Sequence, residues 1–235
     1  MKTTYIYHSC FLVETKLCYY LFDYYRGDLP KLDTDKPILV FSSHSHSDHY
    51  NSAIFSKLRE LGMTQIYGVL SDDIDVKTIP AYISYLSAAP SKEYELPWGQ
   101  HLTTFPSTDE GVAFLIEETL VCPVEEGKEL IYHAGDLNDW VWEGETASYN
   151  EKMTRDYRRQ IDILAAKTKG RKLSCAFVVL DPRQENDYDR GMLYFLGKVD
   201  SNMVYPMHYW EKPQIIRSFV EAHPQYAKKI VFTER

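Results

Sequence analysis

The stretch His44-Ser45-His46-Ser47-Asp48-His49 places three imidazoles and one carboxylate within six residues. Histidine and aspartate are common ligands of transition metals, and their crowding into one short segment favours a metal site. The segment follows the apolar run 38–41 and two serines, a pattern that predicts a buried strand ending in a loop. Chemistry is often located at the carboxyl ends of strands in α/β proteins, so this loop is the first candidate for a functional site.

The spacing within the segment decides which of its side chains can bind the same metal ion. Residues two apart in an extended chain point to the same side, so His44 and His46 can hold one metal ion together. Asp48 lies beyond the strand, and His49 beside it can turn toward a second ion. The alternative is a solvated polar loop without a ligand. A single histidine would favour that alternative, whereas the full pattern favours metal binding.

Two further landmarks follow in the order expected of a known family. The segment resembles the H-x-H-x-D-H signature of the metallo-β-lactamase superfamily. In that family an aspartate that bridges two metals follows a strand and a glycine, and residues 129–136 fit this pattern with His133-Ala134-Gly135-Asp136. A late histidine follows a short strand, and residues 203–208 fit with His208. The resemblance therefore extends from the amino terminus to His208, over nearly the whole chain.

The resemblance implies a single domain over residues 1–235 with an αββα sandwich, in which two mixed sheets lie face to face with helices outside. It also implies one or two zinc ions. Metal one would be held by His44 and His46, metal two by Asp48, His49 and His208, and Asp136 would bridge them.

The chain departs from the family at one ligand. Most members supply a further histidine to metal one, between the first motif and the bridging aspartate. Only His101 and His133 lie in that interval, and both belong to predicted strands away from the expected position. Asp109 aligns there instead and would be an oxygen ligand, which shifts the preference from zinc toward Mn²⁺ or Fe²⁺. Alternatively, residues 107–111 form an ordinary turn and metal one is weak or empty.

Residues outside the motifs are candidates for the surroundings of the site. His8 stands at a strand end, and the ascorbate-lactonase-like branch of the family has a histidine near the site at about this place. Arg183 directly follows the buried strand 176–180, so this guanidinium and that of Arg190 can bind a substrate carboxylate or phosphate. Alternatively, the two arginines pair with nearby aspartates. Aromatic residues are expected to line the pocket: Trp140, Trp142, Tyr209 and Trp210.

The pattern along the chain predicts an α/β fold independently of the motifs. Short strands follow one another up to residue 122, interrupted by a helix over 51–61 with Asn51 as its N-cap and Gly62 as its stop. In the second half, an apolar stripe at helical spacing predicts a helix over 147–167, and a continuous apolar run predicts the buried strand 176–180. Helices over 189–198 and 214–222 and a closing strand over 229–232 follow. Two β-rich halves with helices predict two packed sheets with helices outside.

The composition of the chain argues against some classes of function. The 235 residues carry a formal net charge of −8, with 26 basic and 34 acidic side chains. Such a chain is a poor partner for nucleic acid, because phosphate binding depends on clustered Lys and Arg. No run of eighteen apolar residues predicts a membrane span, and no signal segment is evident, so we expect a cytoplasmic protein. The sequence is compatible with a homo-oligomer. The four cysteines, Cys10, Cys18, Cys122 and Cys175, are expected to be buried thiols.

The implied activity is metal-dependent hydrolysis. A metal lowers the pKa of bound water from 15.7 to about 7, so hydroxide is available near neutral pH. The substrate would be a small metabolite with a lactone, ester, amide or phosphodiester bond, and Asp48 would accept the proton. The alternative, motivated by the missing histidine, is a non-hydrolytic metal-binding or regulatory protein with one degenerate site, or one that performs redox chemistry at iron.

Overall fold

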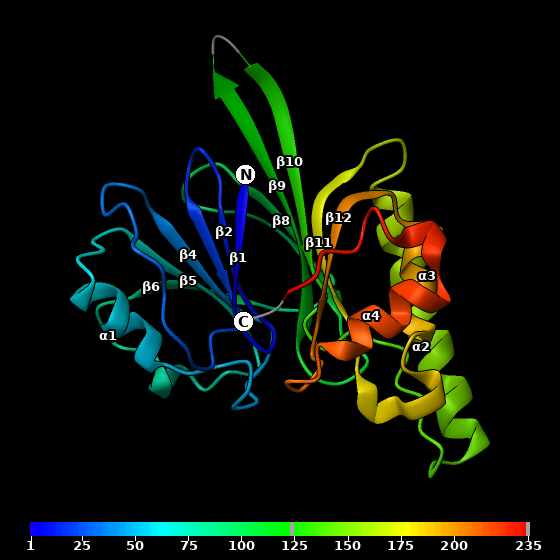
Figure 1. Ribbon diagram of the computed structural model, residues 1–235. Helices are drawn as coiled ribbons and strands as arrows, with labels where there is room; N and C mark the ends of the chain where they lie inside the picture. The colour runs from blue at the N-terminus through cyan, green and yellow to red at the C-terminus, as the bar shows by residue number, and fades with distance from the viewer. Residues whose placement is uncertain (123–124, 234–235) are drawn as a thin grey trace.

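Two six-stranded sheets lie face to face in the computed structural model, which describes residues 1–122 and 125–233 and, within them, the side chains outside 120–127 (Figure 1). The first sheet contains β1 (Lys2–Tyr7), β2 (Cys10–Glu14), β3 (Tyr19–Phe22), β4 (Ile38–Ser42), β5 (Ile66–Ser71) and β6 (Ser84–Ala88), in that order. The second sheet contains β12 (Ser201–Met207), β11 (Leu173–Val179), β10 (Glu125–His133), β9 (Val112–Cys122), β8 (His101–Pro106) and β7 (Glu93–Glu95), in that order.

Both sheets are mixed. In the first, β1, β2 and β3 are antiparallel neighbours, and β3 to β6 are parallel. In the second, β7 to β10 are antiparallel neighbours, and β10, β11 and β12 are parallel. The parallel pairs make several strands end at the same edge of the sandwich, which is where the site loops lie.

Helices cover the outer faces of the sheets. Helix α1 (Ala53–Glu60) lies outside the first sheet, and α2 (Ala147–Lys167), α3 (Arg190–Lys198) and α4 (Gln214–Ala222) lie beside the second (Figure 1). The described residues also form three short 3₁₀ segments: Val76–Thr78, Pro182–Asp187 and Pro224–Tyr226. None of the described helices is long and apolar enough to cross a bilayer.

The side-chain alternation of β4 shows how the layers form. Leu39 and Phe41 belong to the large apolar core that includes the facing strands of the second sheet. Ile38 and Val40 point to the opposite face and pack with the apolar residues of α1. Successive side chains of a strand point to opposite faces, so a strand buried on both sides is apolar throughout. The continuous run 38–41 is therefore a consequence of the layered architecture.

Two local predictions were wrong. Helix α1 begins after Ser52 rather than Asn51, although the Asn51 side chain still accepts a hydrogen bond from the amide of Ala53 at 3.0 Å. The expected closing strand over 229–232 is reduced to one bridge between Val204 and Ile230. The carboxyl-terminal segment thus contacts the edge strand β12 at a single point, too little pairing for a strand.

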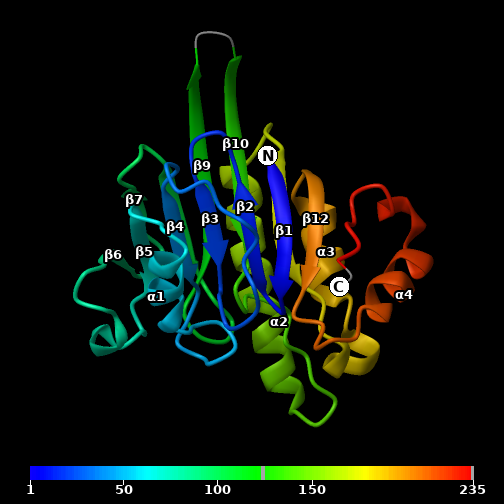
Figure 2. The same cartoon turned by 60° about the vertical axis from the view of Figure 1, so that its left-hand side comes forward.

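The three cysteines with described side chains, Cys10, Cys18 and Cys175, are buried free thiols, as predicted. The side chain of Cys122 lies outside the described residues. Its strand, β9, pairs with β10 in a two-stranded ribbon that extends beyond the body of the sandwich in both views (Figure 2).

Candidate metal centre

The predicted ligands meet in loops at one edge of the sandwich. His8 follows β1, the segment 44–49 follows β4, Asp136 follows β10 and His208 follows β12. Strands β1 and β10 both run downward in Figure 1, so the site lies at the lower end of the sheets. Residues separated by up to 200 positions in the sequence are thus brought together by the topology.

Two glycines allow the loops of the site to pack closely together. Gly111 and Gly135 have φ angles of +68° and +52°, in the left-handed region. A Cβ atom on Gly111 would lie 1.9 Å from the Ser43 carbonyl oxygen and 2.7 Å from Cβ of His44. A Cβ atom on Gly135 would lie 2.6 Å from Cβ of Ser43. The backbone of the histidine loop is therefore packed directly against the turns that carry Asp109 and Asp136.

Four side chains form what we call the inner group: His8, Asp48, His49 and His208. One ligand-type atom from each lies within 4.8 Å of the others. Nε2 of His8 lies 3.4 Å from Oδ2 of Asp48, and Nε2 of His49 lies 3.8 Å from the same oxygen. All three histidines are buried. His8, expected only near the site, is thus placed among the candidate ligands themselves.

Four other side chains form the outer group: His44, His46, Asp109 and Asp136. Nε2 of His44 and Nδ1 of His46 are 3.0 Å apart, and Nδ1 of His46 lies 3.9 Å from Oδ2 of Asp109. The side chains of His46 and Asp109 are 46% and 44% exposed, unlike those of the inner group. The structure therefore places Asp109 beside the histidines of the motif.

Asp136 lies between the two groups. Its Oδ1 is 3.2 Å from Nε2 of His49, and its Oδ2 is 3.5 Å from Nε2 of His208 and 3.8 Å from Nε2 of His44. One carboxylate thus faces histidines of both groups, an arrangement suited to an aspartate shared by two ions.

Unpaired buried atoms show that the residues fit a metal. Among the described residues, Nε2 of His8, Nε2 of His49 and Oδ1 of Asp136 are buried without a hydrogen-bond partner. Buried polar atoms are nearly always paired, because leaving them unpaired costs about 1–3 kcal/mol each. All three atoms point to the ligand clusters, and nitrogen with carboxylate oxygen is a donor set suited to zinc or iron.

Two buried aspartates that the sequence analysis missed orient the histidines. Oδ2 of Asp23 lies 2.8 Å from Nδ1 of His49, and Oδ2 of Asp181 lies 2.9 Å from Nδ1 of His208. Such carboxylates fix the ring and its tautomer, so that Nε2 is available to a metal. Asp23 directly follows β3 and Asp181 lies two residues after β11, and this position behind a buried apolar strand was the signal that could have identified them.

Burial and neighbouring charges shift the pKa values of the histidines and of Asp136 toward their neutral forms. Burial and the neighbouring His49 lower the pKa of His44 to about 3. Burial also lowers the pKa of His49 and of His208. Burial, together with the carboxylate of Asp109, raises the pKa of Asp136 well above its usual value. Neutral imidazole is the form that binds metals, and a bound cation would relieve the crowding of the carboxylates.

Two hollows flank the ligands. The smaller, of about 110 Å³, is lined by Thr108, Asp109, Asp136, Trp140, Trp142, Tyr149 and Arg183. The larger, of about 260 Å³, is lined by Tyr5, Tyr7, His8, Tyr25, Arg26, Asp48, Trp210 and Glu211. Tyr209, also expected at the pocket, is buried and donates a hydrogen bond to the Thr233 carbonyl.

Both arginines singled out in the sequence pair with aspartates. Nη2 of Arg183 lies 2.5 Å from Oδ2 of Asp181. Arg190 pairs with Asp187 at 3.3 Å, and the neighbouring Asp189 contacts His223. Arg183 lines the smaller hollow beside the metal ligands, so it can still contact a substrate there.

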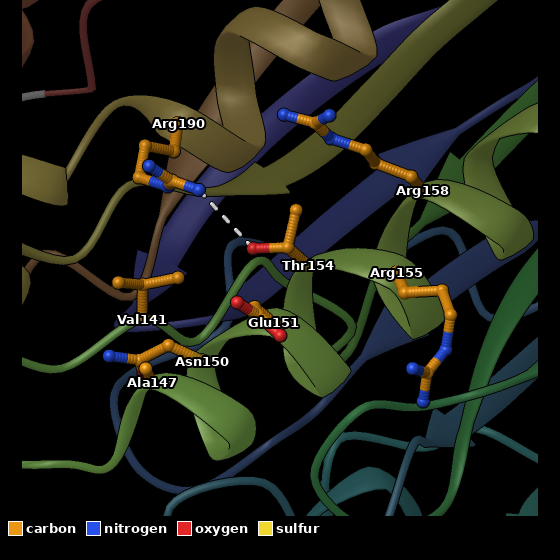
Figure 3. A pocket seen from close by; sticks show the side chains of 8 residues that line it. All are labelled: Val141, Ala147, Asn150, Glu151, Thr154, Arg155, Arg158 and Arg190. Carbon is orange, nitrogen blue, oxygen red and sulfur yellow. Dashed lines mark hydrogen bonds between the residues drawn. The ribbon is translucent and has the colours of Figure 1, made fainter.

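A third hollow lies away from the ligands (Figure 3). It has a volume of about 600 Å³ and involves Arg155, Arg158 and Arg190. Arg190 donates to Thr154 in this hollow at 3.2 Å, and Arg155 contacts Asp156. No residue of the inner or outer group lines it, so it takes no part in the candidate metal centre.

No protein-family model and no curated protein matches the sequence. Solved structures do match. Igni18, a metallo hydrolase from Ignicoccus hospitalis, is 18% identical with a TM-score of 0.62, over 99% of this chain and 94% of that one. Zn²⁺-bound PqqB from Methylobacterium extorquens is 14% identical with a TM-score of 0.53, over 96% and 83%.

CmlA, a diiron β-hydroxylase from Streptomyces venezuelae, is 12% identical with a TM-score of 0.53, over 96% of this chain. This chain spans about half of CmlA, 49% of its length. These likenesses, together with two mixed sheets and helices outside, show the fold. The chain is an αββα sandwich of the metallo-β-lactamase type.

Proposed function

We propose that this protein is a metal-dependent hydrolase of esters or lactones of a small metabolite. The observation that carries the proposal is that the inner and outer groups lie next to each other, each with four residues that offer one ligand-type atom apiece. The carboxylate of Asp136 faces histidines of both groups. Two metal sites that share an aspartate suit the attack of water on a polarised bond. Igni18, a metallo hydrolase that shares the fold, supports the same class, and Zn²⁺-bound PqqB, which also shares the fold, supports a zinc site.

The donor sets favour particular metals. The inner group has three histidines and one aspartate, a set typical of zinc. The outer group has two histidines and two aspartates, a harder set that also accepts Mn²⁺ or Fe²⁺. When bound, such a metal lowers the pKa of a water ligand and polarises a carbonyl or phosphoryl oxygen.

Proton transfer and substrate binding would be performed by side chains of the protein. Asp48 is the carboxylate suited to accept a proton, because its side chain is 25% exposed and lines the larger hollow. Arg183 is the cation that lines the smaller hollow and can bind an anionic part of a substrate. Both hollows are smaller than the 300 Å³ or more typical of sites for drug-sized ligands, which favours a small substrate over a polymer.

A lactone or ester is favoured over a phosphodiester. Acidic residues line both hollows, with Arg183 and Arg26 as the lining cations, and each of these is already paired with a carboxylate. A phosphodiester also carries its negative charge at the reacting phosphorus itself, whereas the reacting carbonyl group of an ester or lactone is uncharged. The resemblance of His8 to the histidine of ascorbate-lactonase-like proteins points to the same choice.

The test is turnover by metal-loaded protein of phenyl acetate, δ-valerolactone and bis-(4-nitrophenyl) phosphate. We expect hydrolysis of the first two, loss of activity after chelation, and recovery on adding Zn²⁺. Asp136→Asn, which keeps the shape but removes the shared charge, should abolish turnover, whereas the exposed Asp28→Asn should not. The absence of metal-dependent turnover with all three compounds would refute the proposal.

A second candidate is redox chemistry or regulation by bound iron. The two carboxylates of the outer group favour it, and the shared fold with the diiron protein CmlA is compatible with it. Metal analysis of protein purified without chelators separates the two candidates. Zinc at two equivalents with ester turnover supports the hydrolase, whereas iron, or one tight ion without turnover, supports the alternative.

A further inference from the structure

Arg183 lies between the two hollows and next to a tryptophan of each. Its guanidinium carbon is 4.6 Å from the ring centre of Trp210, in the larger hollow, and 5.9 Å from that of Trp142, in the smaller. Trp140 and Trp210 also flank His208, with ring centres 5.8 Å and 5.3 Å from the imidazole. The two hollows are therefore two arms of one site, which meet at the candidate metal ligands.

The smaller hollow presents three donors without a protein acceptor. In the described part of the chain, the indole N–H of Trp142, the hydroxyl of Tyr149 and Nη1 of Arg183 make no hydrogen bond. All three side chains line the hollow. The acidic residues that line it, Asp109 and Asp136, belong to the outer group, so a bound cation would compensate their charge. The hollow thus offers donors to an anion.

The larger hollow is different, because its polar groups are mostly paired with one another. Tyr7 and Arg26 both donate to Glu211. The indole N–H of Trp210 donates to Oδ2 of Asp181 at 3.3 Å. The guanidinium of Arg26 lies over one face of Tyr25, 5.1 Å from the ring centre, so what remains for a ligand are the other ring surfaces of the aromatic lining. This hollow therefore suits a planar, uncharged group.

We propose that the substrate is an aryl ester whose acid part ends in a carboxylate, with the aryl group in the larger hollow and the carboxylate in the smaller. The proposal rests on the proposed hydrolase function. One water is consumed: its oxygen bonds to the carbonyl carbon, the bond to the aryl oxygen breaks, and a proton passes to that oxygen. The products are a phenol and a dicarboxylic acid.

The expected selectivity follows from the donors. Hydrogen bonds to a charged group are worth about 1.5–3 kcal/mol each, so losing the carboxylate should cost at least about tenfold in kcat/KM. A matched pair of substrates isolates this effect. The monophenyl ester of glutaric acid carries the carboxylate, and its primary amide has the same shape without the charge.

The first measurement is the ratio of kcat/KM for these two esters with the Zn²⁺-loaded protein. We expect the acid to be preferred at least tenfold, and the phenyl ester to be preferred over the cyclohexyl ester of the same acid. Equal rates for the acid and its amide would overturn the inference while leaving the hydrolase proposal in place.

The second measurement locates the carboxylate. Trp142→Phe and Tyr149→Phe each remove one donor and keep an aromatic ring, so each should reduce the acid-to-amide ratio severalfold. Tyr82→Phe, which removes an exposed hydroxyl elsewhere, is the matched control and should keep the ratio. A preference that survives both donor substitutions would place the carboxylate elsewhere, for example on the metals, and would overturn the inference.

A binding experiment separates this inference from the proposed function. If the protein hydrolyses neither of these esters nor any of the three compounds named under the proposed function, the hydrolase proposal fails, and the monoanilide of glutaric acid is titrated by calorimetry into the same Zn²⁺-loaded variants. Binding that weakens in Trp142→Phe and Tyr149→Phe, but not in Tyr82→Phe, would support the carboxylate site on its own. No binding, or binding unchanged in the donor variants, would overturn it.

Discussion

The inner and outer groups contain the same number of side chains but differ in burial and in charge. The inner group has three buried histidines and a single carboxylate, and two of its histidines are held from behind by the buried aspartates Asp23 and Asp181. The outer group has two carboxylates, and His46 and Asp109 are nearly half exposed. A rigid, nitrogen-rich site should bind zinc tightly, whereas an exposed, oxygen-rich site should bind more weakly and less selectively.

This difference shows that the properties of a metal site depend on the residues that hydrogen-bond to its ligands as well as on the ligands themselves. In the inner group Asp23 and Asp181 fix the rings of His49 and His208. In the outer group, His46 has a second carboxylate neighbour, Glu110, at 3.5 Å, and no buried aspartate orients it in the described structure. The following predictions test whether this contrast is real, from the largest effect to the smallest.

The largest effect is expected from His208→Ala. It removes one of four inner ligands, and the remaining three no longer close the coordination sphere. We expect zinc affinity of the inner group to fall by more than the roughly 10–100-fold typical of losing an outer partner, and turnover to be lost. Zinc per chain is measured by atomic spectroscopy after dialysis against a competing chelator, with His101→Ala as control. Wild-type zinc content in the variant would contradict the assignment.

Asp23→Asn is expected to weaken the inner group by about 10–100-fold, because the charge that orients His49 is lost while the shape is kept. The affinity is obtained from competition with a chromophoric chelator. Asp28→Asn changes an exposed aspartate and is the control. If Asp23→Asn weakened the outer group instead, the two groups would not be supported as the structure indicates.

Gly111→Ala tests how tightly the outer group is packed. The φ angle of +68° costs about 1–2 kcal/mol with a side chain, and the new Cβ would also collide with the Ser43 carbonyl beside His44. Gly99→Ala is a matched control, because it has φ of +84° but open space around it. In urea unfolding we expect the larger loss of stability for Gly111→Ala, accompanied by weaker binding of the second metal equivalent. Equal losses would mean that the loop adjusts freely.

The smallest effect is expected at Asp109. Asp109→Ala should weaken the outer group by about tenfold and leave the inner group in place, because the residue is exposed and contributes one of four ligands. Asp109→His should strengthen zinc binding there, since imidazole suits zinc better. Calorimetric titration of both variants decides. If neither variant changes the weaker site, Asp109 is only a turn residue.

The fold class and several candidate ligands could be predicted because their signals are local. A continuous apolar run predicts a strand buried on both faces, and β4 is buried throughout. The cluster 44–49 begins two residues after β4, Asp136 lies three residues after β10, and His208 directly follows β12. The extents of α1 and of the segment after residue 228 were less predictable, since capping and edge pairing depend on neighbouring loops.

The sequence alone indicated which side chains could bind a metal and that most of them lie close behind a strand, because strand periodicity and residue type are properties of a few adjacent positions. The grouping of these side chains came from the three-dimensional structure. That structure placed His8 beside Asp48, Asp109 beside His46, and Asp23 behind His49. These contacts depend on how two sheets pack and how far loops reach across their edge, and no spacing along the chain encodes that distance.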